Sequence, residues 1–337
     1  MRAFVVTGPR QGAIDEVPDP VANEGEAVVD VLRAGVCGTD VEFWNGEMAY
    51  LHQGHAGYPM RLGHEWCGVV SAVGLGVDAA WLGRRVTGDT MIGCGHCSRC
   101  TSGRHNVCAN RIEIGIRGGA PGALAEQLAV PVAALLALPD GVDNTAGAMV
   151  EPGGNALRSV RAAALEPGER VLVLGTGTLG LLVAEFARAD GVEVHVMGRS
   201  RQSLEFAATL GFAGVWQQAE LPHLSWDAVI DASNAAELPA LALDLVEPGK
   251  RVVYVGLAGH PSLIDSRSLA LKDVTAVGIL AASQGLVGTV EHYAAGYVDP
   301  RPLVAATVGL ERAGDVLAGW RPDTASAGPK LHIDPRL

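Results

Sequence analysis

The first ninety residues alternate short apolar runs with glycine and proline. Such runs occupy residues 3–8, 26–35, 67–74 and 83–89. Evenly spaced runs of this length, bounded by turn residues, are typical of strands in a β-barrel or sandwich. We therefore predict a β-rich unit in this part of the chain.

The pattern changes near residue 150, where helix-like and strand-like segments begin to alternate. Residues 156–166 are rich in helix formers, and the apolar run 171–174 precedes a glycine-rich turn, an apolar-periodic helix and a second strand. Helix, strand, helix and strand then follow at 203–211, 226–233, 236–246 and 250–256. Strands separated by helices in this way predict a parallel sheet. Two helical stretches and a short strand complete the chain, at 285–296, 311–320 and 329–334.

Composition narrows the class of protein. Hydrophobic residues make up 48% of the 337 residues and charged residues 18%, a globular composition with enough apolar material for two domains. The net charge of −12 and the absence of a run of lysines and arginines argue against a nucleic-acid partner. No apolar stretch is long enough for a membrane span or a secretory signal. We therefore expect a cytoplasmic protein, in a compartment where disulfides are uncommon.

Four of the six cysteines lie close together in the spacing C-x2-C-x2-C-x7-C. They are Cys94, Cys97, Cys100 and Cys108. This spacing is compatible with a disulfide knot, an iron–sulfur site or a zinc site. The expected compartment disfavours the knot, and the residue pattern leaves the two kinds of metal site open.

A glycine-rich turn, GTGTLG, places Gly175, Gly177 and Gly180 in a G-x-G-x-x-G pattern. It follows an apolar strand and opens a helix, and in that context the motif indicates dinucleotide binding. The first glycine permits the tight turn, the second lets the backbone approach the pyrophosphate, and the third lets helix and strand pack closely. A purely structural turn is the alternative. The other residues of this candidate cofactor site are Thr176, Thr178 and Leu179.

The second strand of this unit ends in Gly198, Arg199, Ser200 and Arg201. An NAD site usually carries an acidic side chain here, which binds the ribose hydroxyls. Guanidinium groups suit a 2′-phosphate instead, because arginine forms forked, charge-assisted hydrogen bonds with phosphate. The pattern therefore predicts NADP in preference to NAD. The alternative is that both arginines are solvated surface charges.

Three further residues are of metal-ligating types, namely Cys37, His64 and Glu151. Catalytic zinc takes three protein ligands from cysteine, histidine and carboxylates and keeps one position open. Each residue alone is weak evidence for a metal site, so this interpretation depends on the other motifs in the chain.

In its motifs the chain resembles the zinc-dependent medium-chain alcohol dehydrogenases, in the branch of polyol, sorbitol and threonine dehydrogenases. The similarity covers essentially the whole chain, in the family's order. It is carried by AGVCGTD (34–40), LGHEWCGVV (62–70), the cysteine cluster, EP (151–152), GTGTLG (175–180), VVYVGL (252–257) and KDVTAVGIL (272–280).

The resemblance implies an α/β fold, in which a GroES-like β-rich catalytic domain carries an inserted Rossmann domain with a doubly wound parallel sheet. We place the catalytic domain at 1–150 and 285–337, with the cysteine lobe at 94–108, and the Rossmann domain at 151–284. The resemblance adds three residues to the cofactor site, Val255, Gly256 and Leu257.

The resemblance also implies two zinc sites. The four clustered cysteines match the family's closed structural site, and Ala109 stands where a ferredoxin-like run has proline. The matched catalytic ligands are Cys37, His64 and Glu151. In relatives the residue at Glu65 lies close to the metal and sometimes binds it.

Four neighbouring positions bear on the chemistry. Asp40 matches the residue that orients the ligand histidine, and Thr39 matches the hydroxyl that relays the substrate's proton. Two positions depart from the family. Cys67 replaces a small apolar residue, and Glu42 replaces a relay histidine, which leaves the last step of proton transfer open.

The activity that the resemblance implies is hydride transfer between NADP(H) and a secondary alcohol or ketone, such as a polyol, sugar, cyclitol or amino alcohol. The alternatives are an NADPH-dependent carbonyl reductase of a biosynthetic pathway and a non-catalytic cofactor-binding protein. The expected partners are a small alcohol or carbonyl substrate and further copies of the chain, in a homodimer or homotetramer, with neither nucleic acid nor membrane. Residues 43–60 are expected either to line the mouth of the substrate pocket or to pack their own loop.

Overall fold

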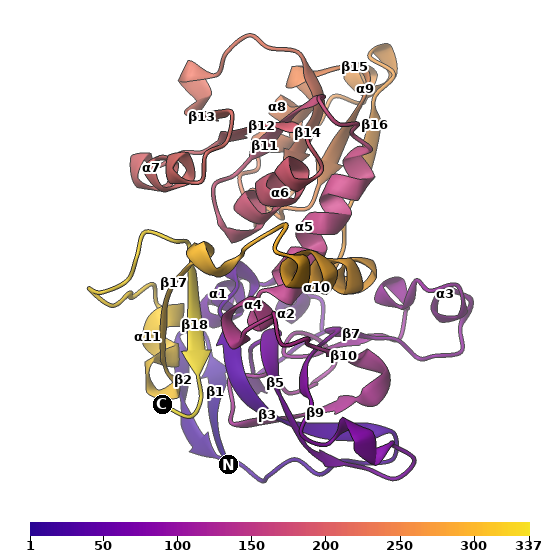
Figure 1. Cartoon of the computed structure of the whole chain (residues 1–337), viewed down its shortest axis with the longest axis vertical. Helices are drawn as coiled ribbons and strands as arrows, with labels where there is room; N and C mark the ends of the chain where they lie inside the picture. The colour runs from indigo at the N-terminus through magenta and orange to yellow at the C-terminus, as the bar shows by residue number, and fades with distance from the viewer.

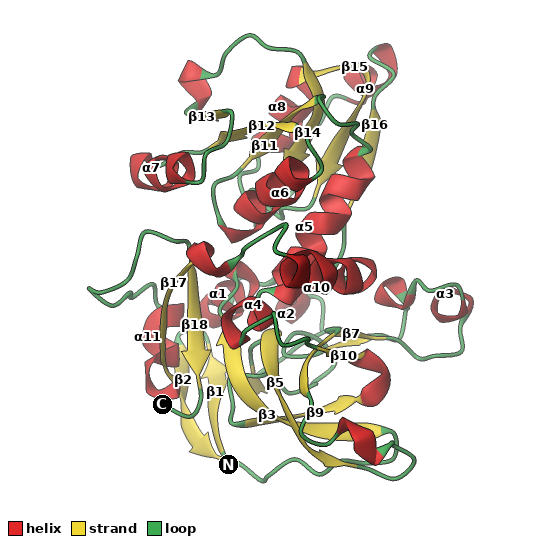
Figure 2. Ribbon diagram, viewed as in Figure 1, coloured by secondary structure: helices red, strands yellow, loops and turns green.

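Two units, each built around its own sheet, make up the protein (Figures 1 and 2). The computed structural model describes all 337 residues. The lower unit in Figure 1 is rich in strands and holds both termini, whereas helices surround the sheet of the upper unit. None of the helices combines the length and the apolar character needed to span a bilayer.

A seven-stranded mixed sheet is the frame of the strand-rich unit. Its strands follow the order β10-β6-β5-β3-β18-β17, and β9 also pairs with β3. They are β3 (Glu26–Gly35), β5 (Glu65–Val73), β6 (Arg85–Gly88), β9 (Gln127–Pro131), β10 (Leu135–Ala137), β17 (Val304–Gly309) and β18 (Lys330–Asp334). A three-stranded sheet and a two-stranded ribbon complete the unit, from β1 (Arg2–Gly8), β2 (Gln11–Glu16), β4 (Met60–Arg61), β7 (Met91–Ile92) and β8 (Ile112–Glu113).

Short helices lie around these strands, and the end of the chain returns to the first sheet. The helices are α1 (Gly38–Asn45), α2 (Ala49–His52), α3 (Ser98–Thr101), α4 (Asn144–Ala148) and α11 (Ala313–Leu317). Strand β18 pairs with β3 and places Leu331 and Ile333 in the apolar core of this unit. Because side chains alternate along a strand, its other face carries the polar residues Lys330, His332 and Asp334.

Six parallel strands form the sheet of the second unit. Their order, β13-β12-β11-β14-β15-β16, is the doubly wound arrangement 3-2-1-4-5-6, so the α/β fold class predicted from the sequence is confirmed. The strands are β11 (Arg170–Leu174), β12 (Glu193–Met197), β13 (Gly214–Trp216), β14 (Trp226–Asp231), β15 (Val246–Tyr254) and β16 (Thr275–Gly278). Its helices are α5 (Val150–Ala163), α6 (Thr178–Ala189), α7 (Arg201–Thr209), α8 (Leu238–Leu245) and α9 (Ser266–Leu271), and α10 (Leu286–Ala295) follows at the boundary with the strand-rich unit.

Helix α5 joins the two units and begins six residues earlier than the helix predicted at 156–166. Its first turn accommodates Pro152, because the missing N–H of a proline has no partner to lose at a helix N-terminus. The helix ends when Ala164 adopts a left-handed conformation with φ 51°. Figure 1 shows α10 beside α5 at the boundary between the units.

Apolar packing at this boundary depends on Phe186 of α6. Its ring is fully buried and contacts two rings of α10. The ring centroid of Tyr293 is 6.1 Å away in a stacked arrangement, and that of His292 is 5.4 Å away and edge-on.

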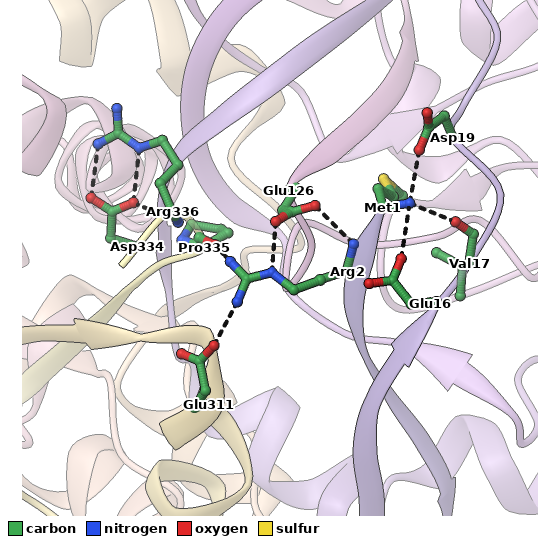
Figure 3. Close-up of polar contacts among 10 residues, drawn as sticks. All are labelled: Met1, Arg2, Glu16, Val17, Asp19, Glu126, Glu311, Asp334, Pro335 and Arg336. Carbon is green, nitrogen blue, oxygen red and sulfur yellow. Dashed lines mark hydrogen bonds and ion pairs between the residues drawn. The ribbon is translucent and has the colours of Figure 1, made fainter.

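Charged contacts fix the first strand to the rest of the strand-rich unit (Figure 3). The amino group of Met1 donates to Asp19 at 2.8 Å. The guanidinium of Arg2 reaches Glu126 at 2.7 Å and Glu311 at 2.6 Å, which joins β1 to the segment after β17.

Replacing Phe186 with alanine tests how strongly the units share this core. Phe186→Ala is expected to lower the free energy of unfolding by about 3–5 kcal/mol, because it leaves a cavity between α6 and α10. Urea denaturation followed by circular dichroism measures the change. The control is Leu263→Ala, whose side chain is 90% exposed and which should shift stability by no more than about 0.5 kcal/mol. Equal effects of the two substitutions would contradict a shared core.

Candidate active site

One buried carboxylate, that of Asp40, holds together two segments that carry candidate ligands. Its Oδ2 accepts a hydrogen bond from the backbone N–H of Cys37 at 2.9 Å, and its Oδ1 accepts one from the N–H of Gly63 at 3.2 Å. Oδ1 also lies 3.4 Å from Nδ1 of His64. Cys37 is the N-cap of α1 and Asp40 is the third residue of that helix, so helix capping itself sets this spacing.

The structure brings three candidate ligands of the catalytic metal together. The ligand atoms of Cys37, His64 and Glu65 all lie within 4.8 Å of one another, with His64 and Glu65 buried. Because Nδ1 of His64 faces Asp40, Nε2 is the ring nitrogen left for a metal. A thiolate, an imidazole and a carboxylate are a donor set that catalytic zinc uses, so these residues fit the ion.

Glu151, the carboxylate matched by sequence, does not belong to this group of three. It is buried in the first turn of α5, where its Oε1 accepts a hydrogen bond from Nδ2 of Asn155 at 2.9 Å. Burial raises the pKa of Glu151 to about 7; the charge of His64 opposes this rise and that of Glu65 adds to it.

Lys330 is a site residue that the sequence analysis missed. Its ammonium lies 2.7 Å and 2.6 Å from the two carboxylate oxygens of Glu65 and also donates to the carbonyl of Val36 at 2.9 Å. The side chains of Lys330 and Glu65 are 4% and 1% exposed, so this ion pair is fully buried. One signal was available, since the chain has only two other lysines, Lys250 and Lys272, and this one begins the predicted final strand.

The four clustered cysteines form a compact set of sulfur ligands around α3. The Sγ of Cys97 lies 3.5 Å from that of Cys100 and 3.7 Å from that of Cys108, and the Sγ atoms of Cys94 and Cys100 are 3.9 Å apart. All four thiols are free, and none of them forms a disulfide in this structure. A tetrahedron with zinc–sulfur bonds of 2.3 Å has edges of about 3.8 Å, so the cluster fits one zinc ion.

The glycine-rich turn lies where the parallel strands end. Gly175 has φ 114°, a left-handed value that favours glycine. A Cβ at Gly180 would lie 2.0 Å from the carbonyl oxygen of Gly175, whereas a Cβ at Gly177 would have no atom within 4 Å. Gly180 therefore serves the packing of helix on strand, and Gly177 faces open space. Thr178 and Leu179 form the first turn of α6.

The end of β12 packs against this turn. A Cβ at Gly198 would meet Oγ1 of Thr176 at 2.4 Å, so glycine permits the close approach. Ser200 caps α7 by accepting a hydrogen bond from the N–H of Ser203 at 3.2 Å. Arg199 and Arg201 are both exposed and form no ion pair.

The end of β15 reaches the same edge of the sheet, because the carboxyl ends of parallel strands lie together. The N–H groups of Val255 and Gly256 both donate to the carbonyl of Asp231, at 3.0 and 2.9 Å. A Cβ at Gly256 would lie 1.8 Å from the carbonyl oxygen of Ser233, so the backbones touch. Leu257 is 70% exposed on the loop that follows.

The remaining candidates divide between the site and the core. Thr39 is half-buried in the first turn of α1, and Glu42 lies on the same helix, where burial raises its pKa. Burial raises the pKa of the Cys67 thiol to about 12, which agrees with a structural role. Phe43 and Trp44 are buried in the core of the strand-rich unit, so these two pack the loop instead of lining a pocket mouth.

Comparison with known proteins shows the family. Two family profiles match, "Alcohol dehydrogenase GroES-like domain" at residues 23–140 and "Zinc-binding dehydrogenase" at residues 178–294. L-galactonate-5-dehydrogenase of Escherichia coli (strain K12) is 33% identical over 298 residues, which cover 82% of this chain and 82% of that protein. The chain belongs to the zinc-dependent medium-chain alcohol dehydrogenases.

Solved structures agree with this assignment along the whole chain. RspB of Escherichia coli CFT073, in complex with NADH, superposes with a TM-score of 0.90 at 26% identity and covers 99% of each chain. A zinc-binding dehydrogenase of Sinorhizobium meliloti 1021, bound to NADP, has a TM-score of 0.89 at 26% identity with the same coverage. The protein is therefore an alcohol dehydrogenase acting on CH–OH donors, and the non-catalytic alternative is not supported.

Gly177 and Gly180 of the turn should respond differently to substitution by alanine. Gly180→Ala is expected to lower the melting temperature, because its methyl group collides with the backbone of Gly175. Gly177→Ala should melt close to wild type but bind a nicotinamide dinucleotide more weakly, because its methyl group occupies the space in front of the turn. Differential scanning fluorimetry with and without cofactor measures both effects. Wild-type cofactor binding by a folded Gly177→Ala variant would contradict this role of the turn.

Proposed function

We propose that the protein oxidises a polyol-like secondary alcohol with NADP at a zinc ion held by Cys37, His64 and Glu65, with Glu151 as a neighbouring carboxylate. The observation that carries the proposal is the convergence of the three ligand atoms beside Asp40. It is supported by the open character of such a site, since three protein ligands leave one position of zinc for a substrate oxygen.

The chain's own residues have separate tasks in this reaction. A zinc ion held there would supply the Lewis acidity that makes an alcohol hydroxyl more acidic, and a bound nicotinamide would supply the hydride acceptor. Asp40 keeps the ring of His64 in one orientation. Thr39, at the start of α1, is placed two residues after Cys37 and receives the substrate's proton through its hydroxyl. Lys330 balances the buried charge of Glu65.

The preference for NADP is supported by the charges at the start of α7. Arg199 and Arg201 lie at the positive end of that helix dipole, where cations are unfavourable and anions are stabilised. No carboxylate pairs with either guanidinium. A 2′-phosphate bound there would supply the missing negative charge.

The substrate class and the assembly are also part of the proposal. A polyol or sugar derivative as the substrate is supported by the similarity to the relative named L-galactonate-5-dehydrogenase. A homodimer is supported by β16, which ends the parallel sheet and pairs only with β15, so its outer edge is free for a second copy. We also keep the proposed division into domains at 1–150 with 285–337 and at 151–284, since β17 and β18 lie in the first sheet.

The choice of cofactor can be tested by reversing one charge. Arg199→Asp is expected to raise the KM for NADP about 10- to 100-fold, because it replaces a charge-assisted hydrogen bond to phosphate with a repulsion. Steady-state kinetics with NADP and NAD measure the ratio of the two kcat/KM values. Arg99→Asp, an exposed arginine of the cysteine lobe, is the control. An unchanged ratio in Arg199→Asp would refute the phosphate site.

The metal assignment can be tested by removing one thiolate from each site. Wild-type protein should contain about two zinc ions per chain, and Cys37→Ser about one, with loss of turnover on a panel of polyols, cyclitols and simple alcohols. Cys100→Ser should lose the other ion and lower the melting temperature. Elemental analysis and nicotinamide absorbance are the readouts. Two zinc ions in Cys37→Ser, or turnover that survives its loss of zinc, would contradict the proposed site.

A further inference from the structure

The cysteine lobe contacts the segment that leads the chain out of the parallel sheet. Strand β16 ends at Gly278 and α10 begins at Leu286, so residues 280–284 form the crossing between the two units. The side-chain amide of Asn106, which is buried in the lobe, donates to the carbonyl of Leu280 at 3.1 Å.

The other end of the crossing is bound by the same amide. Nε2 of Gln284 donates to Oδ1 of Asn106 at 2.9 Å and to the carbonyl of Gly103 at 2.9 Å. A single asparagine of the lobe, Asn106, is therefore hydrogen-bonded to both ends of the crossing, at Leu280 and at Gln284. These hydrogen bonds link residues more than 170 positions apart in the sequence.

A carboxylate makes a second link between the lobe and the crossing. Oδ1 of Asp89 accepts a hydrogen bond from the hydroxyl of Ser283 at 3.0 Å. Its other oxygen lies 2.7 Å from Nε2 of His105 in the lobe. Asp89 belongs to neither segment, so it fixes the lobe and the crossing to the strand-rich unit.

The backbone of the crossing needs this external support. Ala281 has φ 65°, a left-handed conformation that is unfavourable for residues other than glycine. Arg158 of α5 also donates to the carbonyl of Leu280, at 2.6 Å. Immediately after the crossing, a Cβ at Gly285 would lie 2.1 Å from the carbonyl oxygen of Gly154, which leaves no room for a shift.

We propose that Asn106 and Gln284 are positioning residues, through which the cysteine lobe holds the crossing segment and so sets the cofactor edge of the parallel sheet relative to the catalytic ligands. The crossing starts two residues beyond the end of β16, at the edge where parallel strands present their carboxyl ends to a dinucleotide. The lobe thus acts on cofactor binding without touching the cofactor. The kinetic consequence rests on the proposed function, whereas the structural consequence does not.

Hydrogen exchange in the zinc-loaded, cofactor-free protein tests the structural part. Asn106→Ala is expected to speed exchange of the backbone amides in residues 279–286 about 2- to 12-fold, because two hydrogen bonds to the crossing are lost. The matched control is Ser102→Ala, which removes a hydrogen bond to the carbonyl of Arg99 inside the lobe. Equal exchange in the two variants, each with wild-type zinc content, would overturn the proposal.

A variant outside the lobe keeps the test decisive if Asn106→Ala loses zinc. Gln284→Ala should speed exchange in the same peptides without altering the zinc content. The effect of the double variant should be smaller than the sum of the two single effects, because the two residues share the hydrogen bond between them. Fully additive effects would show that the two residues act independently, and would contradict the proposal that they hold the crossing together.

Kinetics test the positioning role. Gln284→Ala should raise the KM for NADP about 2- to 12-fold while kcat changes less than about 2-fold, because the reacting groups themselves are intact. Gln284→Glu, which keeps the length of the side chain but has no N–H to donate, should not restore the KM. A wild-type KM in an active Gln284→Ala enzyme overturns this inference alone. If no variant, including wild type, turns over with any nicotinamide cofactor, the proposed function fails while the exchange result stands.

Discussion

The candidate site depends on keeping one negative charge in the interior, that of Asp40. Burial alone would raise the pKa of this carboxyl group. The pKa is nevertheless lower than usual, because His64 and the N–H groups of Cys37 and Gly63 favour the charged form. The charge therefore persists at the point where α1 and the turn before β5 meet. Because the same carboxylate completes the N-terminal cap of α1, the position of Cys37, the candidate sulfur ligand, follows from helix capping.

The inserted unit contributes an edge and a helix to this arrangement. The parallel sheet gathers the turns after β11, β12 and β15 on one side, and close backbone contacts at Gly180 and Gly256 fix their shapes. Helix α5 contributes the buried Glu151, whose pKa is affected by the charges of His64 and Glu65. Both units therefore contribute residues to the candidate site, and the buried aromatic contacts of Phe186 with α10 help to hold the relative position of the two units.

The local parts of this description could be predicted from the sequence, and the long-range parts could not. The structural roles of Gly175 and Gly180 depend only on a few consecutive residues, so a sequence motif is enough to predict them. The choice between Glu65 and Glu151 is different. Consecutive residues of a strand point to opposite faces, yet His64 and Glu65 reach one group because His64 precedes β5 and only Glu65 begins it. No pattern of residue types shows where a strand begins with that accuracy.

The contact between Lys330 and Glu65 gives a physical reason for the return of the chain to its first sheet. A carboxylate that is 1% exposed needs a partner, because an unpaired buried charge costs several kcal/mol. The partner comes from the last strand of the protein, 265 residues away, and it also binds the carbonyl of Val36 next to the cysteine ligand. Strand β18 thus does more than extend a sheet. It pairs with the buried carboxylate of Glu65, so this part of the candidate site forms only when the end of the chain is in place.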